Sequence, residues 1–414
     1  MRKNTKPQLR FSEFQEQLKK AKLGTLTDKV GSGSTPKGGA SSYVCEGIPL
    51  IRSQNVKDGF LDLTDTAHID LKTHSKMKGS HVHSGDALLN ITGASIGRSC
   101  VVPDYFVEGN VNQHVCIIRP KKTLLDVRYL EQFLRSKYGQ RQIDISQAGG
   151  GREGLNFEAI KGFSIPLMSN KEQQKIADFL TSVDSKISQL TEKHRLLKEY
   201  KKGVMQQMFS QQIHFKNEGG EAFPDWKKKH FGEVFNRVTQ KNTEKNQNVL
   251  TISAQKGLVS QLDYFNKSVA AKDVSGYYLL EKGDFAYNKS YSQGYPMGAI
   301  KPLKLYDKGV VSTLYICFRP KAGFSGDYFE QFFNAGMLNR EITKIAQEGA
   351  RNHGLLNVSV KEFFEDIKLP VPHEKEQQKI AQFLQSIDNK IDAVAEQIEQ
   401  TKQFKKGLLQ QMFV

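Results

Sequence analysis

Two segments of this chain carry nearly the same sequence. Residues 165–210 read IPLMSNKEQQKIADFLTSVDSKISQLTEKHRLLKEYKKGVMQQMFS, and residues 369–414 read LPVPHEKEQQKIAQFLQSIDNKIDAVAEQIEQTKQFKKGLLQQMFV. They align without a gap at an offset of 204, and 23 of the 46 positions are identical. Such a match indicates an internal duplication. We therefore predict two halves, each of which ends in the same segment.

The sequences before the two segments match only weakly. Gly85-Asp86 corresponds to Gly283-Asp284 at an offset of 198, and Glu131-Gln132-Phe133 corresponds to Glu330-Gln331-Phe332 at an offset of 199. Because the offset drifts, insertions and deletions have accumulated in these regions. The sequence thus predicts variable domains alternating with constant helical segments. The expected boundaries are 1–164 and 215–368 for the variable domains, and 165–214 and 369–414 for the constant segments.

Each constant segment is predicted to be one long helix. Its apolar residues recur in alternating steps of four and three, which is the heptad pattern of a coiled coil. The apolar seam positions are Ile176, Leu180, Val183, Ile187, Leu190, Leu197, Val204 and Met208 in the first segment, and Ile380, Leu384, Ile387, Ile391, Val394, Ile398, Leu408 and Met412 in the second. His194, Lys201, Thr401 and Lys405 fill the other seam positions. The alternative is two separate surface helices, each packed on its own domain.

The variable domains have the patterns of mixed α and β structure. Strands are predicted at 48–53, 85–92, 111–120, 248–254 and 310–320, where β-branched and apolar runs are bounded by turn residues. Helices are predicted at 125–143 and 326–346. We therefore expect an α+β fold: two globular mixed α/β domains joined by two long helices, with pseudo-two-fold symmetry.

The composition points to an intracellular protein with a polyanionic partner. The chain has 414 residues, a formal net charge of +16 and four cysteines that follow no paired spacing. We read the cysteines as reduced thiols. No apolar run is long enough for a membrane span, and no signal-peptide core is present, so we expect a cytoplasmic location. A surplus of positive charge favours nucleic acid as partner, although a basic protein without such a partner has the same composition.

Motifs for catalysis or metal binding are not found in the sequence. GSGSTPKGG at 31–39 lacks the ending of a phosphate-binding loop, and no amino-methyltransferase or S-adenosylmethionine motif occurs. Asp184-Ser-Lys186 and Asp388-Asn-Lys390 have a nuclease-like spacing, but on these helices we interpret them as a solvated face. His81 and His83 have no third ligand nearby. We expect no catalytic residue, no metal site and no cofactor on this chain.

Amide, arginine and aromatic residues instead cluster in segments predicted to be loops. Arginine can bind guanine through two hydrogen bonds, and asparagine or glutamine can bind adenine in the same way. The candidate DNA-binding residues are Arg52, Ser53, Gln54, Asn55, Asn90, Arg98, Asn112, Gln113, His114, Arg152 and Asn156 in the first half, and Asn288, Lys289, Ser290, Tyr291, Gln293 with Gly294, Tyr295, Arg351, Asn352 and His353 in the second.

With its twin KEQQKIA motifs at 171–177 and 375–381 and its twin KKG–QQMF endings, the chain resembles the specificity (S) subunit of type I restriction-modification systems. The resemblance covers the whole chain. It implies two target-recognition domains that each read half of a split site in double-stranded DNA, and an antiparallel coiled coil that acts as a spacer. It also implies two modification (M) subunits with S-adenosylmethionine, and up to two restriction (R) subunits that use ATP and Mg.

Physical argument leads to a similar arrangement. A helix from Lys171 to Met208 would be about 57 Å long, and two such helices paired antiparallel would carry one domain at each end. A lean of the domains would then bring their reading faces about one DNA turn, ~34 Å, apart. Two alternatives are a coiled-coil scaffold with two ligand-binding domains that never contact DNA, and a self-contained restriction or modification enzyme. The missing catalytic motifs argue against the enzyme.

Overall fold

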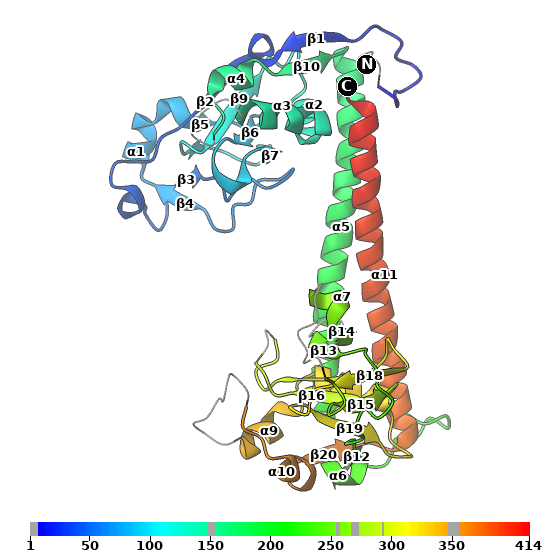
Figure 1. Cartoon of the computed structure of the whole chain (residues 1–414). Coiled ribbons are helices and arrows are strands. Elements are labelled where there is room, and N and C mark those ends of the chain that lie inside the picture. The colour runs from blue at the N-terminus through cyan, green and yellow to red at the C-terminus, as the bar shows by residue number, and fades with distance from the viewer. Residues whose placement is uncertain (1–6, 148–153, 254–256, 266–272, 292–293, 347–355) are drawn as a thin grey trace. The chain divides into compact units, whose positions relative to one another are not determined.

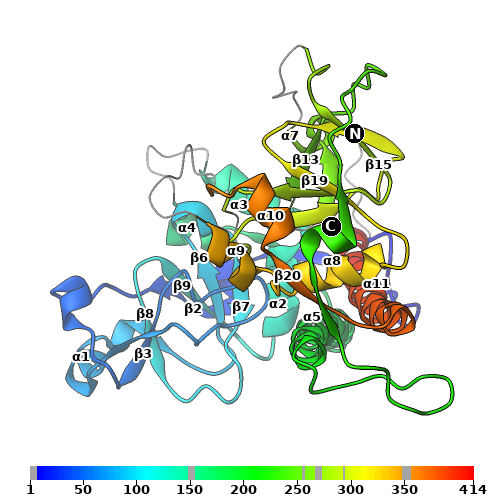
Figure 2. The same ribbon diagram turned by 90° about the horizontal axis from the view of Figure 1, so that it is seen from below.

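The computed structural model describes residues 7–147, 154–253, 257–265, 273–291, 294–346 and 356–414. The chain forms two compact units. Unit 1 comprises Met1–Lys193 and Val394–Val414, and unit 2 comprises His194–Ala393. Each unit therefore contains one variable domain and one half of each long helix. Figures 1 and 2 show the elements of both units in two views.

The variable domain of unit 1 contains two four-stranded sheets. One has the order β2-β9-β6-β7 and is antiparallel throughout, and the other has the order β4-β3-β8-β5. The strands are β1 (Lys19–Lys22), β2 (Thr27–Ser32), β3 (Ile48–Ile51), β4 (Ala67–Ile69), β5 (His81–Val82), β6 (Ala87–Asn90), β7 (Ser99–Val101), β8 (Gly109–Val111), β9 (Val115–Pro120) and β10 (Ser164–Leu167). The helices are α1 (Leu71–Lys76), α2 (Val127–Arg135), α3 (Lys137–Gln147) and α4 (Phe157–Lys161).

The variable domain of unit 2 repeats the first of these sheets, with the order β12-β19-β16-β17. Its strands are β11 (Lys227–His230), β12 (Phe235–Arg237), β13 (Leu250–Ser253), β14 (Gly257–Ser260), β15 (Tyr278–Glu281), β16 (Phe285–Asn288), β17 (Ala299–Pro302), β18 (Lys308–Val311), β19 (Ile316–Pro320) and β20 (Lys368–Val371). Its helices are α6 (Phe231–Val234), α7 (Gln261–Phe265), α8 (Gly326–Asn334), α9 (Asn339–Ile345) and α10 (Val360–Glu365). The faint sequence match between the halves thus reflects a shared sheet.

An ion pair with a buried aspartate recurs in the two matching sheets. Asp86, which is 1% exposed, pairs with Arg119 on β9 at 2.7 Å, and Asp284, also 1% exposed, pairs with Arg319 on β19 at 2.6 Å. Gly85-Asp86 and Gly283-Asp284 were among the few matches visible between the variable sequences. Their repetition follows from this pair, because a buried carboxylate is destabilising unless it keeps its cation.

The structure corrects several predicted element boundaries. The strand predicted at 111–120 is interrupted by a turn at 112–114, and the strand predicted at 310–320 by a turn at 312–315, so each is two strands. The helices predicted at 125–143 and 326–346 are also each divided in two. In the first, Ser136 is extended and binds the last turn of α2 with its backbone N–H. The pattern of apolar residues alone does not reveal such short interruptions.

The two constant segments form the helices α5 (Asn170–Phe209) and α11 (Glu374–Met412). All sixteen apolar seam residues are buried or half-buried. In unit 1 the amino-terminal half of α5 shares a core with Leu408 and Met412 of α11, and in unit 2 the carboxyl-terminal half of α5 shares a core with Ile380 to Ile391. Within each unit the paired helix halves therefore run antiparallel. Of the helices in the described ranges, none combines the length and apolar character that a bilayer crossing requires.

The structural repeat includes the first residues of each variable domain. Phe11 packs edge-on against Phe179 of α5 at 6.0 Å between ring centroids, and Phe215 packs in the same way against Phe383 of α11 at 5.8 Å. Both aromatic pairs are related by the offset of 204 that relates the long helices. At the other end of each domain, β1 pairs with β10 and β11 pairs with β20, directly before the long helix begins. Each domain thus has the same two features where it joins its long helix, an aromatic pair and a two-stranded sheet.

Candidate nucleic-acid interface

Three of the predicted loop clusters lie together in unit 1. The Asn90 side chain on β6 donates to the Ser53 carbonyl oxygen at 2.9 Å. The Asn112 backbone N–H donates to Ile51 at 3.1 Å, and the Ile91 N–H donates to His114 at 3.0 Å. The loops that follow β3, β6 and β8 are therefore joined by hydrogen bonds, as a composite reading surface requires.

Three asparagines in these loops are buried and form hydrogen bonds with other residues of the loops. Asn55, Asn90 and Asn112 are 2%, 0% and 7% exposed. The Asn55 side-chain amide donates to the backbone carbonyl oxygens of Asp62 and Asp65, and the Asn112 side-chain Oδ1 accepts from the His114 N–H. In this structure their side chains are hydrogen-bonded within and between the loops. Contact of these three asparagines with DNA stays a prediction.

The remaining predicted residues of unit 1 are more accessible. Gln54, Arg98 and Gln113 are exposed, whereas Arg52, Ser53 and His114 are half-buried. Arg52 lies over the Tyr43 ring at 6.0 Å. Asn156 is exposed, but its side chain caps α4 by accepting from the Ala159 N–H at 2.7 Å.

The equivalent loop of unit 2 follows β16. Asn288, Lys289, Ser290 and Tyr295 are half-buried, and Tyr291 is 60% exposed. Lys301 lies over the Tyr295 ring at 4.8 Å and donates to its hydroxyl at 2.8 Å. Gly294 is exposed, and Gln293 lies outside the described residues.

The residues shortly after Arg152 and shortly after His353 make equivalent hydrogen bonds in the two units. Leu155, just after the first loop, donates its N–H to the Ile91 carbonyl at 2.9 Å. Leu356, just after the second, donates to the Lys289 carbonyl at 3.0 Å. Arg152, Arg351, Asn352 and His353 themselves lie outside the described residues.

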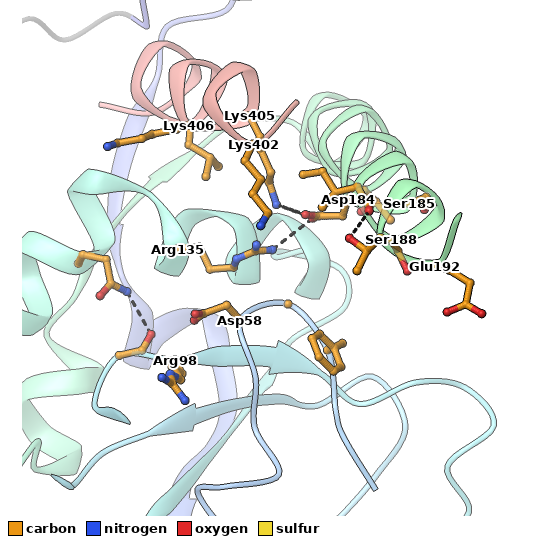
Figure 3. A pocket seen from close by; sticks show the side chains of 18 of the residues that line it. Asp58, Arg98, Arg135, Asp184, Ser185, Ser188, Glu192, Lys402, Lys405 and Lys406 are labelled. Atoms are coloured by element: carbon orange, nitrogen blue, oxygen red, sulfur yellow. Dashed lines mark hydrogen bonds and ion pairs between the residues drawn. The ribbon is translucent and has the colours of Figure 1, made fainter. Parts of the chain in front are cut away.

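A cleft of about 1130 Å³ lies between the loops that follow β3 and β6 and the helix pair of unit 1. Asp58, Phe60 and Arg98 line it from the loop side, and Lys402 and Lys406 line it from α11 (Figure 3). Gly59 has a φ of +92° and lies so close to Arg135 that a Cβ there would come within 2.5 Å of the guanidinium Nη1. The loop at 58–60 is therefore packed directly on the end of α2.

A group of charged and amide side chains joins α2 to both long helices at this cleft. Asp184 of α5 accepts from Lys405 of α11 at 2.5 Å, from Gln132 of α2 at 2.9 Å and from Arg135 at 3.2 Å. Figure 3 shows Lys405 and Arg135 directed at the Asp184 carboxylate. Burial disfavours the ionised carboxylate, but the Arg135 and Lys405 cations outweigh that effect and lower the pKa of Asp184. Burial raises the pKa of the neighbouring Glu131 to about 7.

Unit 2 contains the same arrangement with the roles of the long helices exchanged. Asp388 of α11 accepts from Lys201 of α5 at 2.6 and 2.7 Å and from Gln331 of α8 at 2.9 Å. The interpretation of Asp184 and Asp388 as members of a solvated face is therefore wrong, since each accepts hydrogen bonds from two other elements. The sequence carried a signal for the glutamines, because Glu131-Gln132-Phe133 and Glu330-Gln331-Phe332 were matched. It carried no signal for what they contact.

Within the described ranges, no group of three or more His, Cys, Asp or Glu side chains is placed to hold a metal ion. His81, considered in the sequence as a ligand, instead stacks on His74 with ring centroids 4.0 Å apart.

Comparison with known proteins agrees with the repeated architecture. The chain matches the family described as type I restriction modification DNA specificity domain twice, over residues 16–199 and 224–403. A putative type I restriction enzyme MjaX specificity subunit from Methanocaldococcus jannaschii is 22% identical over 433 residues, which cover 96% of this chain and 93% of that protein.

Two solved structures show the same fold. The crystal structure of a type I restriction-modification system S subunit from M. genitalium covers 99% of both chains with a TM-score of 0.58 and 16% identity. A chain from a structure of the type I R-M system, described in terms of complex assembly and conformational transition, covers 96% of this chain and 97% of that chain with a TM-score of 0.52 and 16% identity. With two family matches that together span most of its length, the chain belongs to the type I restriction-modification DNA specificity family.

Proposed function

We propose that this chain is the DNA-recognition subunit of a type I restriction-modification complex, and that residues 1–164 and 215–368 each read one half of a two-part site. The observation that carries the proposal is the double match to the DNA specificity family, because each match covers most of one variable domain. The repeated sheet order and the net charge of +16 support it. As a specificity subunit the chain recognises DNA and does not itself catalyse a reaction.

The reading chemistry that we propose uses the accessible members of the joined loops. Arg98, Gln54 and Gln113 are exposed in unit 1, and Tyr291 is exposed in unit 2. Arginine and glutamine can distinguish guanine and adenine through paired hydrogen bonds in the major groove, whereas lysine holds phosphates without regard to sequence. Arg152 and Arg351 remain candidates on chemical grounds.

We further propose that the long helices, at 165–214 and 369–414, act as the spacer and dock two M subunits. S-adenosylmethionine would then be bound by the M subunits, and ATP with Mg by up to two R subunits. Methylation of an adenine within a duplex requires that the base be flipped out, which would be the task of the M subunits. Such a complex would act on DNA in the cytoplasm.

Methylome sequencing tests the division into half-sites. Cells that express this chain with its M subunits should carry one split methylated motif that disappears when the gene is deleted. Replacing residues 9–164 with the matching domain of a relative should change only one half of that motif. Replacing residues 215–368 is the matched control and should change only the other half. A change in both halves, or in neither, after a single replacement would contradict the proposal.

Binding to duplex DNA separates this function from that of a scaffold without DNA contacts. Affinity for random-sequence duplex should fall steeply as salt increases, because neutralised phosphates release their counterions. Arg98→Ala should weaken binding to the cognate site by about 1–3 kcal/mol if the guanidinium contacts a base. A chain that binds no duplex even at low salt would support the scaffold.

A further inference from the structure

We propose that Gln132 and Gln331 are positioning residues, each of which sets the orientation of one recognition domain on the helix pair and thereby the fidelity of one half-site. This inference rests on the proposed function. Its structural basis is the duplicated group formed by Gln132, Asp184 and Lys405 in unit 1 and by Gln331, Asp388 and Lys201 in unit 2.

The two groups have been kept although their surroundings have changed. The aspartates and lysines are related by an offset of 204, whereas the glutamines are related by an offset of 199. Residues have therefore been gained or lost between the glutamine and the aspartate. In spite of this, the Gln Nε2 to Asp Oδ2 distance is 2.9 Å in both units. The contact depends on the fold and has survived a change in chain length.

Both glutamine side chains are buried at positions where an apolar side chain would cost less free energy to bury. Each is 3% exposed, and the Oε1 atom of each is buried without a hydrogen-bond partner among the described residues. A buried polar atom that lacks a partner is destabilising. The Nε2 group must face the aspartate, because an ionised carboxylate only accepts hydrogen bonds. A glutamine is present in both units although its unpartnered oxygen is destabilising. We therefore infer that it orients the domain and does not serve to stabilise the fold.

Apolar contacts hold the same helices together but do not fix their angle. Phe413, the residue that follows α11, packs against Tyr129 and Phe133 of α2 with centroid distances of 5.4 and 5.7 Å. Phe209 of α5 packs against Tyr328 and Phe332 of α8 in the same way, at 5.9 and 5.4 Å. Hydrophobic attraction is not directional, whereas a hydrogen bond to a fixed carboxylate is. The glutamine therefore adds a directional contact to the hydrogen bonds that Gln173 and Gln377 of the long helices accept at the starts of α2 and α8.

The two units differ in how far each depends on its glutamine. In unit 1, Arg135 of α2 also reaches Asp184, and Arg128 of α2 donates to Asp178 at 2.6 Å, so α2 keeps two further polar contacts with α5. In unit 2 the corresponding position is Asn334, whose side chain accepts from Lys301 instead. Gln331 is thus the only side chain of α8 that is hydrogen-bonded to Asp388 among the described residues. We expect the second half-site to depend more strongly on its glutamine than the first.

The test uses Gln132→Met and Gln331→Met in the full chain with its M subunits. Methionine is similar in length and removes both the directional bond and the unpartnered oxygen, so the melting temperature should not fall. Discrimination against single mismatches in the cognate half-site should drop by about tenfold or less for Gln132→Met and by more for Gln331→Met. Each variant should leave the other half-site unchanged and is therefore the control for the other.

A second readout does not depend on DNA. Amide hydrogen exchange of the free chain should rise in α2 for Gln132→Met and in α8 for Gln331→Met, without a lower melting temperature. Equal losses at both half-sites together with a lower melting temperature would show a merely structural role and overturn the inference. Unchanged exchange with unchanged mismatch discrimination would also overturn it. Failure of the proposed function is recognised separately, because the unmodified chain would then direct methylation to no split motif.

Discussion

Lys405 and Asp184 form an ion pair between α11 and α5 at 2.5 Å, and the lysine side chain is only 5% exposed. Lys201 and Asp388 form the equivalent pair in unit 2 at 2.6 Å. Both lysines occupy seam positions of the heptad pattern, where a charge without a partner would weaken the helix pair. Because each lysine pairs with an aspartate of the opposite helix, these positions form specific contacts that favour one register of the helix pair.

Removing one member of a pair should cost more than removing both. Lys201→Met should destabilise the chain by about 2 kcal/mol, between the values of exposed and fully buried pairs, because Asp388 keeps no other cation within ion-pair distance among the described residues. The double variant with Asp388→Leu should recover part of that loss. Lys405→Met should cost less, because Asp184 keeps Arg135. Urea unfolding of the original chain, the single variants Lys201→Met and Asp388→Leu and their double variant provides the cycle, and strictly additive effects would contradict coupling.

A fragment of residues 1–214 should form a homodimer. Lys201 is the equivalent of Lys405, so Lys201 of one copy would face Asp184 of the other and both ion pairs would be retained. Lys201→Glu in the fragment should abolish the dimer, and the additional change Asp184→Lys should restore it. Sedimentation at tens of micromolar distinguishes the three forms. A Lys201→Glu fragment that dimerises as tightly as the original would show that these pairs do not direct the association. With M subunits, the original fragment should direct methylation to an interrupted palindrome.

Stability should decrease with pH through the titration of Glu131. Burial raises its pKa from 4.5 to about 7, so the folded chain holds this proton more tightly than the unfolded chain. The favourable contribution is complete below about pH 4.5 and is lost as pH rises through about 7, amounting to roughly 3 kcal/mol at most. Glu131→Gln should therefore raise the melting temperature at pH 8 relative to the original chain, with a smaller difference at pH 5. A difference that is the same at both pH values would contradict this account.

Two glycines in the long helices should be replaceable with a gain in stability. A Cβ at Gly203 or Gly407 would meet no atom within 4 Å. Alanine at either position should therefore stabilise the helix by about 1 kcal/mol. Gly139 in α3 is the control, because a Cβ there would lie 2.3 Å from the Phe133 carbonyl oxygen. Gly139→Ala should lower the denaturation midpoint, whereas the other two changes should raise it. A loss of stability in Gly203→Ala would mean that the exposed helix face is constrained by something other than helix propensity.

The sequence by itself determined the duplicated layout, the two long helices and the family. These features depend on local periodicity and on an internal repeat, and both can be recognised in a single sequence. The apolar seam from Ile176 to Met208 predicts a helix because its spacing is the spacing of one helix face. A short interruption such as Ser136 is not visible in the same way, because a single extended residue changes little in an apolar pattern.

Only the tertiary structure decided which polar residues face solvent and which are bonded within the chain. Asn90 and Gln54 have the same chemistry, yet Asn90 is fully buried and Gln54 is exposed. Asp184 and Asp388 looked like members of a solvated face because the lysines that pair with them lie 221 and 187 residues away in the sequence. Contacts between such distant residues depend on how the helices and domains pack, and packing leaves no local pattern in a sequence.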